Sequence, residues 1–339
     1  MIVAIVLSGL IFAILLTAFL SFYFTFYSSE KGRKDNPLYI PKGVIKKDKV
    51  SQVKLALEKF SEKEFECVKI KSFDNLKLCG KFYKIAADDS PIIIFFHGYR
   101  SSSYCDGMGA YRVAKKNGYN YLAVTQRAHG DSEGRVITFG VKERRDVISW
   151  VDYVTKRFSD APIVLYGISM GATSVLCALD EELNKEVLNH KVYDKRLNER
   201  GIKDKVYAVV SDCGFSSAPN VIKEKISSKM KLPPFIFYPF VYLGALMFGG
   251  FNLKRADTLS ALKNNKIPVI FLHGEKDDVV PIDMAKEEYA ACGGKKRLIV
   301  FPEATHGTSF LTGPQKYLVN VSEFLQKNVK NYKKSVKKV

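Results

Sequence analysis

The length, composition and charge of the chain exclude several classes of protein. Its 339 residues suit one large domain with an extension, or two small domains. A content of 47% hydrophobic and 12% aromatic residues excludes a disordered chain. The formal net charge of +18 would attract phosphates, but the sequence has neither a zinc-ligand spacing nor an aromatic RNA-binding motif. We therefore expect no nucleic-acid partner, and favour attraction to anionic lipids or simple solubility.

Residues 1–29 predict a transmembrane anchor. They contain no Asp, Glu, Lys, Arg or His, and as a helix the apolar part would reach roughly 40 Å, more than the ~30 Å of a hydrocarbon core. A cleaved signal peptide is the alternative, but no basic region precedes the run and no clear cleavage site follows it. Lys31, Arg33 and Lys34 come directly after it, so the positive-inside rule predicts a single-pass protein whose main domain is cytoplasmic.

Residues 30–62 predict a basic spacer next to the membrane, and residues 63–333 a single α/β domain followed by a basic tail at 334–339. The spacer is lysine-rich and ends in a short helical pattern over 50–60. Two strands joined by a turn at Asp74 come next, and would bring Cys67 and Cys79 across a hairpin. Six cysteines without regular spacing nevertheless favour free thiols.

Continuous apolar runs then alternate with helical patterns, which predicts a mostly parallel sheet with helices on both faces. The runs cover residues 92–96, 121–125, 163–166, 206–210, 269–272 and 298–301, and the clearest helical patterns cover 141–158 and 170–179. Two segments interrupt the alternation. Residues 180–205 are densely charged and predict a solvated surface helix. Residues 215–262 contain an uncharged stretch, 232–253, with three prolines.

The pentapeptide Gly167-Ile168-Ser169-Met170-Gly171 predicts a nucleophile. It directly follows one apolar run and directly precedes a helical pattern, which is the strand–turn–helix setting of a nucleophile elbow. Glycines suit a turn that leaves no room for larger side chains. The turn would expose the Ser169 hydroxyl, and the N–H groups at the start of the helix would face developing negative charge.

A serine hydroxyl needs a base, and three histidines follow Ser169 in the chain. In nucleophile elbows the acid and then the histidine follow the serine, which leaves His97 and His129 out. His190 lies in the charged insertion, and His273 would need Asp212 as its acid. His306 follows the last apolar run, with acidic residues after the run before it. We therefore predict His306 as the base.

The acid should follow the run 269–272, where Asp277 and Asp278 both qualify and Glu275 is a third candidate. The stretch from His273 to Pro281 resembles the His-Gly-x-x-Asp-x-x-Val-Pro segment of α/β-hydrolases. In that family the aligned aspartate orients the histidine, and the resemblance therefore implies Asp277.

An oxyanion hole needs two backbone donors. One is expected to be the N–H of Met170, the residue after the nucleophile. The other should come from the loop after the run 92–96, and the family resemblance implies the N–H of Tyr99, with Gly98 allowing close approach. His97 would then hold the loop.

Further segments carry the resemblance. Residues 127–134, 137–140, 143–150 and 211–217 are similar to those of bacterial serine aminopeptidase-like or general α/β-hydrolases. The likeness covers about residues 64–330 and implies an α/β-hydrolase fold, with a mostly parallel eight-stranded sheet flanked by helices. The family hosts esterases, thioesterases, deacetylases, acyltransferases and peptidases, so it does not name a substrate.

The apolar stretch 232–253 is long enough to span a membrane, but we predict a cap over the site within residues 215–262. A crossing there would separate Ser169 from Asp277 and His306, and the prolines are expected to break a helix near its start and middle. Its aromatic content favours an acyl, lipid-like or other small hydrophobic substrate.

The sequence thus predicts a membrane-anchored serine hydrolase that cleaves a carboxylic ester or thioester, without a metal or organic cofactor. A peptidase acting on short peptides uses the same chemistry and is the first alternative. A catalytically inactive, membrane-bound binding module is the alternative from another class. The oligomeric state cannot be predicted from these features.

Overall fold

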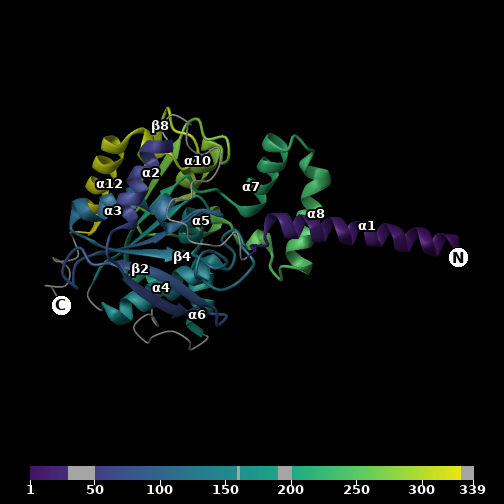
Figure 1. The fold of residues 1–339 in the computed structure, drawn as a ribbon, viewed down its shortest axis with the longest axis horizontal. Helices are drawn as coiled ribbons and strands as arrows, with labels where there is room; N and C mark the ends of the chain where they lie inside the picture. Colours follow the sequence, from purple (N-terminus) through teal and green to yellow (C-terminus); the bar gives the residue numbers. More distant parts are fainter. Residues whose placement is uncertain (30–49, 159–160, 190–200, 330–339) are drawn as a thin grey trace.

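The centre of the molecule is one eight-stranded sheet (Figure 1). The computed structural model describes residues 1–29, 50–158, 161–189 and 201–329. The strand order is β1-β2-β4-β3-β5-β6-β7-β8; β1 and β2 pair antiparallel, and β3 to β8 run parallel. The strands are β1 (Glu66–Lys71), β2 (Lys77–Tyr83), β3 (Ile92–Phe96), β4 (Asn120–Thr125), β5 (Ile163–Ile168), β6 (Val206–Asp212), β7 (Val269–Gly274) and β8 (Lys296–Phe301).

The predicted α/β fold is confirmed, and the sheet register explains where a site can form. The side chains of β3, β5 and β7 are all buried, as continuous apolar runs require in a sheet covered on both faces. Phe96 pairs with Gly167, and Ile168 pairs with Asp212, so β3, β5 and β6 end at one edge. Residues that follow these strands therefore meet at the carboxyl edge of the sheet.

Helices cover both faces, each over its own hydrophobic cluster. One face carries α2 (Val50–Ser61), α3 (Ser103–Asn117) and α12 (Pro314–Val329). The other carries α4 (Glu143–Arg157), α5 (Met170–Cys177), α6 (Glu181–Asn189), α9 (Thr258–Lys263) and α10 (Ile282–Ala291). A short helix, α11 (Ser309–Thr312), follows the predicted base.

The predicted cap lies between β6 and β7. It contains α7 (Ala218–Glu224), a π-helical turn (Lys225–Lys229) and the apolar α8 (Pro234–Met247). One expectation is wrong: Pro239 lies inside α8 without ending it. A proline this close to the helix start removes a single backbone hydrogen bond, and the apolar packing of Val241 and Ala245 outweighs that loss.

The predicted anchor is the helix α1 (Ile2–Thr25), which projects away from the domain (Figure 1). Within the described ranges it is the helix that is long and apolar enough to span a membrane. Its end is attached to the domain: the Ile137 N–H donates to the Phe26 carbonyl, and the Ser28 N–H to the Arg135 carbonyl. Helices α1 and α8 also pack together, which the sequence did not indicate.

Several predicted segments fall partly or wholly outside the described residues: positions 30–49 of the spacer, 190–200 of the charged insertion with His190, and the tail 334–339. The described part of the insertion contains α6, as expected of a surface helix. All six cysteines are free, and Cys67 faces Lys81 rather than Cys79 across the hairpin.

Candidate active site

Ser169 lies at a strained turn between β5 and α5. Its φ is 53° and its ψ is −119°, a conformation that a non-glycine residue adopts only when its surroundings enforce it. Both flanking glycines are sterically required. A Cβ at Gly171 would lie 2.6 Å from the Phe96 carbonyl carbon and 2.7 Å from the His97 oxygen, and one at Gly167 would overlap the backbone of Gly171 and Ala172.

The structure brings Ser169, His306 and Asp277 together although they are far apart in the chain. The Ser169 hydroxyl lies 2.8 Å from His306 Nε2, and His306 Nδ1 lies 2.8 Å from Asp277 Oδ2. The other oxygen of Asp277 accepts the N–H groups of Val279 and Val280, both at 2.9 Å. The carboxylate is thus fixed at one oxygen and directed at the imidazole with the other.

The electrostatics keep Asp277 charged. Burial alone would raise its pKa, but the charge of His306 and the hydrogen bonds from His306 and the Val280 N–H hold the pKa below its ordinary value. Asp278, the competing candidate, is exposed and paired with Lys229. Glu275 is exposed as well.

The second pair considered from the sequence, His273 with Asp212, does not form. His273 is buried, its Nε2 lies 2.8 Å from the Val280 carbonyl, and burial lowers its pKa. Asp212 instead accepts hydrogen bonds from Ser309 at 3.2 Å and Tyr317 at 2.8 Å. Burial raises the pKa of Asp212 to about 7 despite these bonds.

Two backbone N–H groups are free beside Ser169. Among the described residues, neither the Tyr99 nor the Met170 N–H donates a hydrogen bond to the protein. Gly98 lets the loop of residues 97–100 approach the serine, since a Cβ there would be only 3.4 Å from Ser169 Cβ. Asp106 fixes this loop by accepting the Gly98 N–H at 2.7 Å and the Ser101 hydroxyl at 2.8 Å. Asp106 was not predicted from the sequence, where it looks like an ordinary acidic residue in the first turn of a helix.

His97 has the loop-holding contacts expected of it. Its Nδ1 lies 2.8 Å from the Gly98 carbonyl, and its Nε2 accepts the Gln126 N–H at 3.1 Å. Burial holds its pKa well below the usual range, so the ring is neutral. His129 supports the same loop by accepting the Arg100 N–H at 3.0 Å. Sequence reasoning had assigned no such role to His129.

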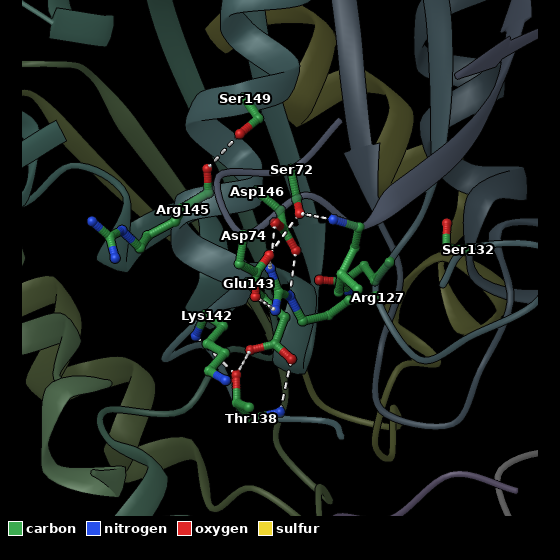
Figure 2. Close-up of polar contacts among 12 residues, drawn as sticks. Ser72, Asp74, Arg127, Ser132, Thr138, Lys142, Glu143, Arg145, Asp146 and Ser149 are labelled. Atoms are coloured by element: carbon green, nitrogen blue, oxygen red, sulfur yellow. Dashed lines mark hydrogen bonds and ion pairs between the residues drawn. The ribbon is translucent and has the colours of Figure 1, made fainter. Parts of the chain in front are cut away.

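A buried polar cluster surrounds Arg127, two residues before His129 (Figure 2). Arg127 donates to Asp146 through two nitrogens, at 2.6 and 2.7 Å, and to Asp74 at 2.9 and 3.0 Å. Glu143 accepts the N–H groups of Thr138 and Gly140 nearby, at 2.8 and 2.9 Å. Burial raises the pKa of Asp146 to about 6, although the adjacent Arg127 charge lowers it. The segments 127–134, 137–140 and 143–150, which carry the family resemblance, therefore form the cluster that fixes the loop behind the site.

Replacing Arg127 by methionine should lower the free energy of unfolding by about 3–5 kcal/mol, because Asp146 would remain buried without its partner. The matched control is Arg157→Met. Arg157 also binds a carboxylate with two nitrogens, but its partner Glu66 is half exposed, and the loss should be under about 1 kcal/mol. Thermal unfolding of the full chain in detergent measures both. Equal losses would contradict the structural role of the buried cluster.

One group of described residues has the spacing of a metal site: Cys213, Asp277 and His306. Burial raises the pKa of Cys213 well above its usual value, which favours the neutral thiol. Asp277 and His306 already bind each other. Their hydrogen bond accounts for this grouping without a metal ion.

A cavity of about 830 Å³ leads to Ser169 and His306. Its wall is largely apolar and comes from the cap and, unexpectedly, from α1. The residues that line it from these two parts are Thr17, Leu20, Ser21, Phe24, Thr25, Phe215, Val221, Ile222, Lys225, Ile226, Lys229, Met230, Phe237 and Val241. The end of α1 also binds the loop of residues 97–100: the Tyr99 hydroxyl donates to the Thr25 carbonyl at 2.8 Å, and Arg100 to the Phe24 carbonyl at 2.9 Å.

This sheet, with a serine turn after β5 and a histidine after β8, has the architecture of a hydrolase built on a parallel sheet. The sequence agrees: the model of the alpha/beta hydrolase family matches residues 93–319, and the chain belongs to that family.

The chain is also similar to individual proteins. The esterase PF2001 of Pyrococcus furiosus superimposes with a TM-score of 0.60 and 25% identity, over 79% of this chain and 93% of that one. YqkD of Bacillus subtilis, which is uncharacterized, is 22% identical over 72% of this chain and 74% of its own length. The lysophosphatidylserine lipase ABHD12 of Danio rerio is 24% identical over 61% of this chain, and the match spans about half of the lipase, 49%.

Proposed function

We propose that the chain is a membrane-anchored serine hydrolase that cleaves a carboxylic ester or thioester through an acyl-Ser169 intermediate. The observation that carries this proposal is the continuous relay of hydrogen bonds from Ser169 through His306 to Asp277, at a strained turn. Such a relay has the parts that activate a serine hydroxyl.

Each group has a role in the proposed reaction. Ser169 Oγ attacks the carbonyl carbon while His306 Nε2 takes its proton, and Asp277 stabilises the imidazolium that forms. The N–H groups of Tyr99 and Met170 bind the oxyanion. His306 then protonates the leaving alcohol or thiol, the acyl group stays on Ser169, and a water molecule activated by His306 releases the acid.

An ester or thioester fits the cavity better than a peptide. The wall is mostly apolar, as an acyl chain requires. An aminopeptidase would need a carboxylate for the peptide amine, but Asp278 in the lining is already paired with Lys229, and Lys225 adds a further positive charge. An esterase and a lipase among the similar proteins support the same choice.

The helix α1 is the proposed anchor, since its residues up to Ile14 are exposed and, apart from Ser8 and Gly9, apolar. The basic residues Lys31, Arg33 and Lys34 after it favour a cytoplasmic active site. Digestion of the domain by a protease added outside intact cells would contradict this topology.

A fluorophosphonate probe should label the wild-type chain and fail to label Ser169→Ala. The same variant should lose ester hydrolysis by about 10⁴- to 10⁶-fold, because no other group forms the acyl intermediate. Ser174→Ala is the matched control, since this buried serine on the same helix binds the Met170 carbonyl and should leave labelling intact. Folded wild-type protein that resists the probe would favour the inactive binding module instead.

A further inference from the structure

The part of α1 that extends beyond its contact with the cap is shorter than the thickness of the hydrocarbon core of a bilayer. Its side chains are exposed from Ile2 to Ile14, whereas Ala18 and Phe22 are buried against the cap. At 1.5 Å per residue, positions 2–16 span about 22 Å, against a hydrocarbon core of about 30 Å. A spanning α1 therefore places about five more residues, 17–21, in hydrocarbon, and any tilt increases that number.

The cap helix α8 contacts α1 at this depth. Gly244 of α8 lies against the Ala18 carbonyl, and a Cβ there would be 3.1 Å from Phe22 Cβ. The ring of Phe248 lies 5.3 Å from that of Phe19, centroid to centroid. Figure 1 shows α8 crossing α1 while the rest of α1 projects beyond it. The crossing point is thus inside the part of α1 that a bilayer must enclose.

The outer surface of α8 is suited to hydrocarbon. The helix contains no charged residue, and apolar side chains are exposed at both of its ends. Phe235 is 79% exposed and Met247 is 54% exposed. Contact with hydrocarbon would remove these exposed apolar side chains from water, which is favourable.

The opening of the cavity lies beside the crossing of α1 and α8. Leu20 and Phe24 of α1 and Met230 of the cap line the cavity and yet are 43%, 68% and 58% exposed, so they form its rim. Lys225 and Lys229 line the cavity and are also exposed; Lys229 is paired with Asp278, so Lys225 supplies the positive charge near the rim that suits an anionic lipid head group.

We propose that α8 is embedded in the bilayer beside α1, and that the cavity opens into the lipid, so that an acyl lipid of the membrane enters from the side. Helix α1 then serves as a wall of the substrate site as well as an anchor. The placement of α8 rests on the proposed anchoring by α1 together with packing and length, whereas lateral entry of a substrate also rests on the proposed hydrolase activity.

Quenching of tryptophan fluorescence by brominated lipids tests the placement. The chain has a single tryptophan, Trp150, which is fully buried in the domain core and gives a constant background. Phe235→Trp and Met247→Trp, in the full chain reconstituted into phosphatidylcholine vesicles brominated on the acyl chains, should each lose at least about half of the added fluorescence. Leu55→Trp, at a 53% exposed position on α2, is the control and should lose almost none. Extra quenching no greater than that of the control would contradict the placement.

A second measurement tests lateral entry separately. Phe235→Asp should lower hydrolysis of a long-chain lipid ester in vesicles at least about tenfold, because a charge opposes insertion, and leave hydrolysis of a short water-soluble ester unchanged. Leu55→Asp should change neither rate. Equal loss on both esters, or no loss on either, would contradict lateral entry. Failure of the wild type to hydrolyse any ester would count against the proposed function, while the quenching result would stand by itself.

Discussion

Replacing Asp277 by asparagine is expected to lower kcat by about 10⁴-fold with little effect on folding. The asparagine oxygen still accepts the N–H groups of Val279 and Val280, so the loop keeps its shape. The amide nitrogen that takes the place of Oδ2 is a hydrogen-bond donor, so it cannot accept the hydrogen bond from the His306 Nδ1–H group. The imidazole then adopts the wrong tautomer and its protonated form loses its charge partner. Hydrolysis of a short water-soluble ester, measured on protein of unchanged thermal stability, checks the prediction.

The neighbouring carboxylates supply the controls for this prediction. Asp278→Asn removes an exposed group paired with Lys229 and should lower kcat less than about tenfold. Glu275→Gln, on the exposed part of the same loop, should stay within about twofold. If Asp278→Asn lowered kcat as much as Asp277→Asn does, the assignment of Asp277 as the residue that orients His306 would be contradicted.

The sheet could be predicted because its strands are buried on both faces and therefore appear as continuous apolar runs. Some apolar runs in the sequence end before the corresponding strand does, and they do so where the strand approaches the site. The run 163–166 continues as strand to Ile168, and the run 206–210 to Asp212. The small and polar residues Gly167, Ser211 and Asp212 complete these strands, and hydrophobicity alone cannot show that they do.

The positions of the candidate site residues were predictable because parallel strands bring their carboxyl ends to one edge. The choice of Asp277 over Asp278 came from the family resemblance, because spacing alone does not show which side chain faces inward after a loop. The role of Asp106 in fixing Gly98 could not be predicted from the sequence, because it depends on a hydrogen bond across a turn.

The docking of α1 on the cap could not be predicted from the sequence either. An apolar side chain has the same hydropathy whether it contacts lipid or protein. A helix that packs against the domain at one end is therefore predicted as a membrane anchor along its whole length. The contact depends on close approach at Ala18 and Gly244, two small residues from distant parts of the chain. Small residues have too many other uses to indicate such a pair without the structure.

Replacing Gly171 by alanine should lower the free energy of unfolding by at least about 3 kcal/mol, or roughly 10 °C in the unfolding midpoint. The added Cβ would overlap the Phe96 carbonyl oxygen and lie 2.7 Å from the His97 oxygen, and backbone cannot rotate away as a flexible side chain can. Relief requires β3 and the loop of residues 97–100 to separate from α5. That movement would also part the Tyr99 and Met170 N–H groups, so the protein that still folds should show little ester hydrolysis. Ser174→Ala on the same helix removes only a hydroxyl and should cost about 1 kcal/mol or less. Thermal unfolding in detergent compares the two variants, and wild-type stability of Gly171→Ala would mean that the serine turn is less tightly packed against β3 than the structure shows.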